Sequence, residues 1–261
     1  MATGNSCGTS FDGKVAFVTG AAGGMGRAIA IAFAAEGAQV LVADIAAEGG
    51  EETALLIRDA GGVAEFVRTD VADSRAVAAA VGRAVDMFGS LDCAVNAAAI
   101  EFETVPLHLC EDDDFDKMMA VNVRSVFLSM KYELRAMLGH GQGGAIVNIA
   151  STNSFRPQPN QPAYTTSKHG VLGMTRSGAI DYAKHGIRVN AICPGAIDTP
   201  MLRTAMARRG RDAEDTANRL SLFGRFGQPS EIASAALWLC GEGSSNTTGH
   251  ALAVDGGYLA R

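Results

Sequence analysis

The strongest constraint on the fold is an alternation of short apolar segments with longer stretches of helical periodicity. Seven such segments, each four to six residues long, lie at 14–19, 39–44, 65–69, 91–96, 145–150, 188–193 and 251–254. Most are rich in Val, Ile or Ala on both faces, which is typical of strands in a parallel sheet covered on both sides. Between them, apolar residues recur at helical spacing, as in Val77, Val81, Val85 and Phe88. The alternation predicts an α/β fold: a doubly wound, mostly parallel sheet of seven strands with helices on both faces.

Nothing in the composition divides the chain, so we expect a single domain over residues 12–261. Residues 1–10 are mostly polar and small, and we expect a flexible tail over residues 1–11. A chain of 261 residues that is 48% hydrophobic can bury a sizeable core. Its 22 basic and 28 acidic residues give a net charge of −6, which argues against nucleic acid as a partner.

Cysteine and histidine usage indicates a reduced protein without a metal centre. The five cysteines are Cys7, Cys93, Cys110, Cys193 and Cys240. They are widely spaced and form no C-x-x-C pair, which is typical of free thiols in a cytoplasmic protein. The histidines show no ligand spacing, so no metal site is predicted. No targeting signal is visible, and the longest uncharged stretch, 136–155, contains His140, Gln142 and Asn148 and is too polar to span a membrane.

A glycine-rich turn follows the first apolar segment, with the pattern T-G-x-x-x-G-x-G from Thr19 to Gly26. Glycines between a strand and a helix let the backbone approach a pyrophosphate, and the helix N-terminus supplies N–H groups and a positive dipole. The spacing is wider than G-x-G-x-x-G, and a glycine-rich turn alone can be a plain loop. The absence of a G-K-[ST] sequence argues against a triphosphate site. We assign Gly20, Gly24, Met25 and Gly26 to binding of a dinucleotide.

An acid, Asp44, ends the second apolar segment. A carboxylate at this position can accept hydrogen bonds from both hydroxyls of an adenosine ribose, and it repels a 2′-phosphate. Neither Ile45 nor Ala46 supplies a cation that would bind a 2′-phosphate. The pattern predicts NAD rather than NADP as the cofactor, the alternative being that Asp44 is only a solvated acid at a strand end.

Two further segments end in residues that we assign to the cofactor. Asp70 and Val71 follow the third segment and can hold the adenine edge, although Asp70 could instead cap the next helix. Asn96 ends the fourth segment and is followed by three alanines. These small residues leave room for a ligand, but they are equally compatible with tight packing.

The sharpest functional signal combines Ser151, Tyr164 and Lys168. Tyr164 and Lys168 are four residues apart, so they share one face of the helix predicted near 162–184. A free tyrosine has a pKa of about 10, and a neighbouring cation favours the phenolate. We therefore expect Lys168, together with a positively charged nicotinamide ring in a dry site, to lower the pKa of Tyr164 enough for proton exchange with an alcohol. Ser151 follows the segment at 145–150, where ligands dock in open α/β sheets, and can hydrogen-bond a substrate oxygen.

From about residue 12 to 258 the chain resembles the short-chain dehydrogenase/reductase family. The resemblance rests on the glycine turn, Asp44, Asp70, the Asn96 segment, Asn122, Ser151, Tyr164, Lys168, Pro194-Gly195 and Thr199. It implies a Rossmann-type fold with a nicotinamide dinucleotide as cofactor. It also implies that Tyr164 is the general acid/base, that Ser151 orients the carbonyl, and that Lys168 lowers the pKa of Tyr164 and binds the nicotinamide ribose.

The resemblance also assigns roles to positions outside these three. Asn122 would fix a water of the proton relay, although an asparagine there can also simply bond to helix backbone. Thr199 would bind the nicotinamide carboxamide, and Val71 and residues 192–195, including Pro194 and Gly195, would line the cofactor cleft. One departure stands out: the family usually carries N-N-A-G where this chain has Asn96 followed by three alanines. We expect a modest effect, because alanine is small.

Residues 199–226 are expected to form a lid over the substrate. Met201, Leu202 and Met206 would give it an apolar inner face. The same stretch carries six arginines, Arg203, Arg208, Arg209, Arg211, Arg219 and Arg225. These arginines either recognise an anionic substrate or, more simply, form a solvated helix face. We assign Ser151, Asn153, Tyr164 and Met201 to substrate contact; Phe155 and Gln161 either share that role or only pack.

The sequence thus predicts an NAD-dependent oxidoreductase that interconverts a secondary alcohol and a ketone by hydride transfer. Two alternatives remain. A 3-oxoacyl thioester reductase is disfavoured by Asp44, because such reductases usually use NADPH. A catalytically silent dinucleotide-binding protein is disfavoured because Tyr164 and its acid/base partners are all present. The helices expected near 113–138 and 162–184 are apolar on more than one side, and with the family resemblance they predict a homotetramer.

Overall fold

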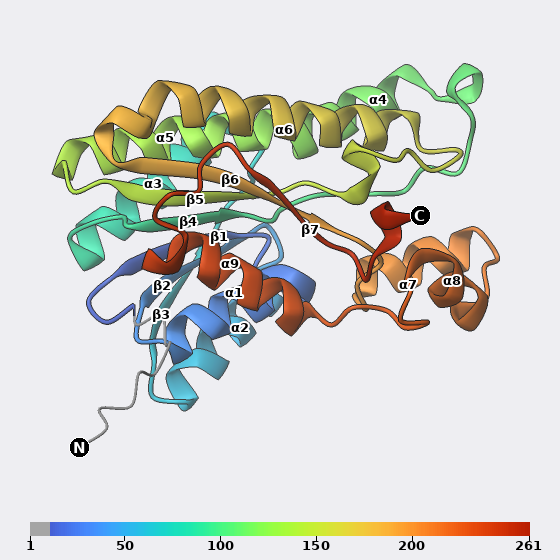
Figure 1. The fold of residues 1–261 in the computed structure, drawn as a ribbon. Coiled ribbons are helices and arrows are strands. Elements are labelled where there is room, and N and C mark those ends of the chain that lie inside the picture. Colours follow the sequence, from blue (N-terminus) through green and yellow to red (C-terminus); the bar gives the residue numbers. More distant parts are fainter. Residues whose placement is uncertain (1–10) are drawn as a thin grey trace.

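The computed structural model describes residues 11–261 and centres on one seven-stranded sheet (Figure 1). The strands are β1 Val15–Thr19, β2 Gln39–Asp44, β3 Val63–Arg68, β4 Cys93–Asn96, β5 Gly144–Ile149, β6 Ile187–Pro194 and β7 Ala251–Val254. Their order across the sheet is β3-β2-β1-β4-β5-β6-β7, and every neighbouring pair is parallel. The predicted doubly wound Rossmann-type fold is confirmed, with a wholly parallel sheet where a mostly parallel one was expected.

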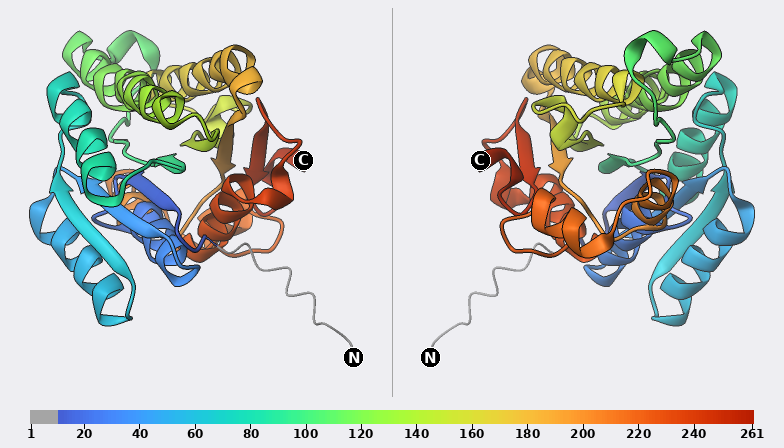
Figure 2. Two further views of the ribbon diagram at one scale, coloured as in Figure 1. Left: turned by 90° about the vertical axis from the view of Figure 1, so that its left-hand side faces the viewer. Right: turned by 90° about the vertical axis from the view of Figure 1, so that its right-hand side faces the viewer.

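Helices cover both faces of this sheet, as Figures 1 and 2 show. On one face lie α1 Gly24–Ala35, α2 Ala47–Asp59 and α9 Pro229–Cys240. On the other lie α3 Ser74–Phe88, α5 Ser125–His140 and α6 Pro162–Tyr182. A shorter helix, α4 Asp112–Met119, runs through a π-helical turn at Ala120–Arg124 directly into α5. The sheet therefore separates two apolar cores.

The alternation of side chains along each strand explains the two cores. In β1, Val15 and Phe17 pack against the α3, α5 and α6 side, whereas Ala16 and Val18 pack against the α1 and α9 side. All four are buried. Strands that are apolar on both faces are stable only when both faces are covered, which is the pattern that the sequence predicts.

Local signals set several helix ends. Asp73, rather than Asp70, caps α3, where its side chain accepts a hydrogen bond from the backbone N–H of Arg75. The first turn of α4 contains three acids, Asp112, Asp113 and Asp114. Their negative charges interact favourably with the positive end of the helix dipole. Pro162 begins α6, at a position where the missing N–H costs nothing.

Two regions complete the description. The predicted lid contains α7 Pro200–Arg208 and α8 Ala213–Leu220, which lie beyond the carboxyl ends of the strands at one end of the molecule (Figure 1). The predicted tail lies outside the described residues except for Phe11, which is buried against Phe33 with ring centroids 5.0 Å apart. The packed chain therefore includes residue 11. In the part of the chain that the structure describes, no helix is both long and apolar enough to cross a membrane.

Candidate active site

Two adjoining cavities lie at the carboxyl ends of the strands. The first is lined by the glycine turn, Asp44, Asp70 and Val71, and the second by Ser151, Tyr164 and the lid. The two share Met25, Thr199 and Met201, so they form one continuous cleft. The strand order reverses at β1, which lies between β2 and β4, and ligands of open α/β sheets bind at such a point.

The glycine turn forms one wall of the first cavity. Gly20 has φ +67°, and a Cβ there would lie 2.7 Å from the Cα of Ala98. A Cβ on Gly26 would lie 2.1 Å from the carbonyl oxygen of Gly20. No other residue fits at either position. Gly23 and Gly24 face the cavity without side chains, so the wall is bare backbone at the start of α1. This arrangement fits a pyrophosphate.

Asp44 lies at the end of β2 and lines the same cavity. Its carboxylate accepts hydrogen bonds from the backbone N–H groups of Ala22 and Ala46, both at 2.9 Å. The acid therefore braces the glycine turn from the neighbouring strand, which a merely solvated acid would not do. Ile45, beside it, is exposed and also lines the cavity.

The ends of β3 and β4 complete the first cavity. Asp70 accepts a hydrogen bond from the backbone N–H of Ala72 at 2.9 Å, and Val71 is buried beside it. Ala97 and Ala98 donate backbone hydrogen bonds to the Thr19 hydroxyl, at 3.1 and 3.3 Å, and the three alanines after Asn96 line the wall. Their methyl groups are compatible with a cavity here, as expected for the departure from N-N-A-G.

The side chain of Asn96 is not among those that line the cleft, and the assignment of this residue to cofactor binding stays a prediction. Its amide nitrogen donates to Glu133 at 3.1 Å and to Asn148 at 3.0 Å, on the side of the sheet covered by α5. The physical reason is strand alternation, because Asn96 is two residues after Ala94, which packs in the core on that side. Glu133 is fully buried, and its burial raises the pKa of its carboxyl to about 8.

Helix α6 places Tyr164 and Lys168 on one face, as the spacing predicts. The Lys168 Nζ atom lies 5.6 Å from the centroid of the Tyr164 ring. Lys168 is buried, and its ammonium donates to the carbonyl oxygen of Ile149 at 2.8 Å. Ser151, immediately beyond β5, lines the cavity with Tyr164 and is within hydrogen-bonding reach of the phenol. The three side chains that the sequence singles out are therefore together.

The protein's own groups raise, rather than lower, the pKa of Tyr164. Burial raises it to about 12; the hydrogen bond with Ser151 lowers it, the charge of Glu101 raises it and that of Arg209 lowers it. Lys168 makes no large contribution, and burial lowers its own pKa to about 8. In the protein alone, desolvation of the phenolate outweighs the nearby charges. The lowering expected from Lys168 together with a bound, positively charged nicotinamide ring stays a prediction.

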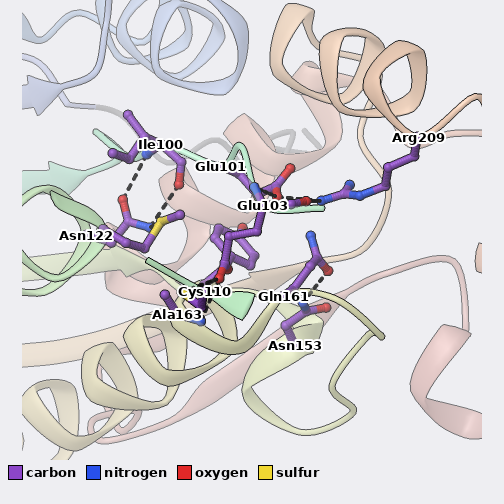
Figure 3. A network of polar contacts seen from close by, with 11 residues as sticks. Ile100, Glu101, Glu103, Cys110, Asn122, Asn153, Gln161, Ala163 and Arg209 are labelled. Carbon is purple, nitrogen blue, oxygen red and sulfur yellow. Dashed lines mark hydrogen bonds and ion pairs between the residues drawn. The ribbon is translucent and has the colours of Figure 1, made fainter. Parts of the chain in front are cut away.

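Asn122 lies in the π-helical turn between α4 and α5 and is buried. Its side-chain oxygen accepts from the backbone N–H of Ile100 at 2.8 Å, and its nitrogen donates to the Ile100 carbonyl at 2.9 Å (Figure 3). The nitrogen also donates to the Ser167 hydroxyl at 3.2 Å. The side chain thus joins the segment after β4 to the helix that carries Tyr164. The water of a proton relay remains a prediction for this residue.

Glu103 holds the first turn of α6, a role that the sequence did not predict. The residue is buried, and its two carboxylate oxygens accept hydrogen bonds from the backbone N–H groups of Ala163 at 2.9 Å and Tyr164 at 2.7 Å (Figure 3). A carboxylate at a helix N-terminus is stabilised by both the orphan N–H groups and the helix dipole. Glu103 therefore positions the backbone of Tyr164.

Arg209 of the lid joins the same segment (Figure 3). Its guanidinium forms an ion pair with Glu101 and donates to the backbone carbonyl of Glu103 at 2.6 Å. Both Arg209 and Glu101 line the second cavity. No local motif marks Glu101 or Glu103, since their roles depend on where the segment after β4 passes in space.

The assigned substrate residues lie around the second cavity. Ser151, Asn153, Tyr164 and Met201 all line it, as does Gln161, whose side-chain oxygen accepts from the Asn153 amide at 2.9 Å. Phe155 is exposed and is not among the residues that line this cavity. The apolar inner face of the lid is confirmed, since Met201, Leu202 and Met206 line the cavity.

Pro194, Gly195 and Thr199 lie where the two cavities meet the end of β6. The Thr199 hydroxyl accepts from the backbone N–H of Leu202 at 3.3 Å and caps α7. The sequence assigns Lys168 to both catalysis and cofactor binding. In the structure, Lys168 is not among the residues that line either cavity. The remaining cofactor assignments, apart from Asn96, line the cleft.

Known proteins resemble this chain over almost its full length. Residues 20–259 match a family described as Enoyl-(Acyl carrier protein) reductase. The chain is 41% identical over 256 residues to short chain dehydrogenase/reductase astE of Aspergillus oryzae, covering 98% of each protein. It is 43% identical over 254 residues to 2,5-dichloro-2,5-cyclohexadiene-1,4-diol dehydrogenase of Sphingobium indicum, covering 97% of this chain and 99% of the relative.

Solved structures agree with these relatives. The crystal structure of levodione reductase superposes with a TM-score of 0.90 at 34% identity, covering 96% of this chain and 99% of that one. A putative 2-deoxy-D-gluconate 3-dehydrogenase from Agrobacterium tumefaciens, with bound NADP, gives a TM-score of 0.86 at 36% identity. The match covers 98% of this chain and 100% of that one. The chain therefore belongs to the short-chain dehydrogenase/reductase family, and it is an oxidoreductase that acts on CH–OH groups.

Proposed function

We propose that the protein interconverts a secondary alcohol and a ketone, with NAD as the hydride carrier and Tyr164 as the general acid/base. One observation carries the proposal most: the Tyr164 hydroxyl and Ser151 face a cavity that continues into a glycine-walled cleft. This cavity encloses about 900 Å³ including its open mouth, which suits a small or medium substrate beside a nicotinamide ring.

The residues present fit a dinucleotide. Gly20, Gly24, Met25 and Gly26 would hold the pyrophosphate against the start of α1. Asp44 would accept from the ribose hydroxyls, and Asp70 and Val71 would border the adenine. The nicotinamide half would lie near Tyr164, Lys168, Pro194, Gly195 and Thr199.

When bound, the nicotinamide ring accepts hydride from the carbinol carbon or returns it to the ketone. The chain's own groups hold the oxygen and handle the proton. Ser151 and Tyr164 hydrogen-bond the substrate oxygen. In the reducing direction the neutral Tyr164 donates its proton to that oxygen, and its high pKa keeps the proton available at neutral pH. In the oxidising direction, additional positive charge in the site is needed to favour the phenolate.

Asp44 supports NAD over NADP in this proposal. Its carboxylate lines the cavity at the end of β2, and its neighbours Ile45 and Ala46 carry no charge. A 2′-phosphate placed there would meet an acid and no base. One related structure contains bound NADP. The cofactor preference of this protein therefore has to be measured directly.

We further propose a cytoplasmic homotetramer. Apolar side chains on the outer faces of α5 and α6 are exposed, among them Phe127 and Ile180. A groove between these two helices is lined by apolar side chains, among them Leu138 and Met174, together with the charged Lys131, Arg135 and Asp181. A second copy of the chain packed on this face would remove the apolar surface from water.

The proposed activity is tested with a panel of secondary alcohols and NAD or NADP, followed by absorbance of the reduced nicotinamide. We expect turnover with at least one class of alcohol and higher kcat/KM with NAD. Tight NAD binding without turnover of any alcohol or ketone would instead indicate a catalytically silent dinucleotide-binding protein. Higher kcat/KM with NADP would overturn the cofactor assignment alone.

A further inference from the structure

The lid brings positive charge to the end of the substrate cavity. Arg209, which follows α7, and Arg211, which precedes α8, both line the cavity that contains Tyr164 and Ser151. Arg219, on α8, is near enough for its charge to act on Arg211. A cavity for an alcohol needs no cation at its rim, so these arginines require an explanation of their own.

Within the cavity, Arg209 already has a counter-charge. Its guanidinium pairs with Glu101, and the two side chains are only 13% and 6% exposed. It also donates to the backbone carbonyl of Glu103 at 2.6 Å. This pair is neutral overall and joins the lid to the segment after β4, so it has a structural role without any ligand.

Arg211 has no such partner. Among residues 11–261, its guanidinium makes no hydrogen bond or ion pair, and Glu101 is already bound to Arg209. Partial burial lowers the pKa of Arg211, and the charges of Arg219 and Arg209 lower it further, whereas the charge of Glu101 raises it. A half-buried cation beside other cations is unfavourable unless an anion accompanies it.

The charges around the cavity indicate which anion would fit. Arg209, Glu101 and Arg211 together carry a net charge of +1. Arg219 is exposed and donates to the side-chain oxygen of Gln158 at 3.3 Å. A single carboxylate balances the net charge, and its two oxygens match the planar donor fork of a guanidinium. A dianionic phosphate would leave an excess negative charge next to Glu101.

We propose that Arg211 forms an anion subsite and that the substrates are hydroxy acids or oxo acids, with a carboxylate bound at the lid and the carbinol or carbonyl at Tyr164. This inference rests on the proposed alcohol–ketone activity and names the substrate class for it. The carboxylate would also hold the lid closed, because Arg211 lies between α7 and α8.

The test compares each acid with its neutral counterpart. Initial rates with NAD are measured for 3- and 4-hydroxycyclohexanecarboxylate and for their methyl esters, in the wild type and in Arg211→Gln. We expect the wild type to prefer an acid over its ester by about tenfold or more in kcat/KM, mainly through KM, because a charged hydrogen-bonded pair is lost in the ester. Arg211→Gln reduces that ratio to near one, and Arg211→Lys retains part of it.

Arg208→Gln is the matched control, because Arg208 is an exposed arginine of the same lid outside the cavity-lining residues. It keeps the wild-type ratio. A wild-type ratio near one, or a ratio that survives Arg211→Gln, overturns the subsite. If no alcohol or ester is turned over, the proposed activity fails. Calorimetric titration of the enzyme–NAD complex with the same carboxylates then decides the subsite: binding that is lost in Arg211→Gln supports it, and binding independent of Arg211 overturns it.

Discussion

At the scale of single residues, the site depends on groups that hold Tyr164 as much as on Tyr164 itself. Glu103 binds the backbone of its helix turn, and Ser151 lines the same cavity within reach of its hydroxyl. The Lys168 ammonium donates a hydrogen bond to the carbonyl oxygen of Ile149, the last residue of β5, and this bond orients the side chain. The phenol is thereby fixed between the start of α6 and the end of β5, which is the precision that proton transfer requires.

Glu103→Gln tests this positioning. The amide leaves only one acceptor for the two N–H groups and removes the negative charge from the helix start. We expect a loss of about 1–3 kcal/mol in the free energy of unfolding, measured in urea. We also expect kcat to fall more than the affinity for NAD. Glu111→Gln is the control, because Glu111 precedes α4 without a side-chain cap bond. Equal effects of the two substitutions would argue against a positioning role.

Which site residues were predictable follows from the range of the interactions involved. Tyr164 and Lys168 are neighbours on one helix, so their spacing alone predicts their contact. The side chain of Asn96 bonds to Glu133 and Asn148 away from the cleft, and the alternation of the strand residues before it contained that signal. Glu103 and Arg209 meet only through tertiary folding, and the sequence around them has no motif. The high pKa of Tyr164 was missed because burial cannot be read from spacing.

At the scale of elements, we expect the end of β2 to determine the cofactor preference. Asp44→Asn combined with Ile45→Arg removes the repulsion of a 2′-phosphate and supplies a cation for it. We expect the ratio of kcat/KM for NAD to that for NADP to fall by roughly a hundredfold, as two charged contacts are changed. Ile45→Gln alone keeps Asp44 and should leave NAD preferred. An unchanged ratio in the double variant would exclude this strand end as the determinant.

Helix α5 carries a buried acid whose protonation affects stability. Burial raises the pKa of Glu133 to about 8 in the folded protein, from about 4.5 when exposed. The folded state thus keeps a proton that the unfolded chain releases. The stabilising contribution is complete below about pH 4.5 and is lost as the pH rises towards 8. We expect the urea midpoint of the wild type to fall between about pH 5.5 and 7.5 by more than that of Glu133→Gln. Parallel pH profiles would show that Glu133 is ionised in the fold.

The elements themselves were predicted well, and for a physical reason. Strands covered on both faces leave a continuous apolar signature, and the glycine turn is required by backbone contacts that exclude a Cβ. Boundaries shifted by one to two residues at several ends, as with β3, which begins at Val63 rather than at residue 65. Such ends depend on pairing with a neighbouring strand, which local sequence does not determine.

At the scale of the whole molecule, exposed apolar side chains point to assembly. Ile180 on α6 is 81% exposed, and Phe127 on α5 is 51% exposed. We expect a particle of four 27.0 kDa chains by analytical ultracentrifugation. Ile180→Glu should shift it to smaller species, whereas Leu55→Glu, at an exposed position on α2 across the sheet, should not. A monomeric wild type would contradict the assembly.

The central claim is that the Tyr164 hydroxyl exchanges a proton with the substrate oxygen beside the dinucleotide. The most direct measurement compares the wild type with Tyr164→Phe, which keeps the ring and removes only the hydroxyl. Affinity for reduced cofactor is followed by fluorescence, and ketone reduction by initial rate. The account predicts unchanged cofactor affinity within a few-fold and a fall in kcat of about a thousandfold. A Tyr164→Phe variant that reduces ketone at the wild-type rate would contradict it.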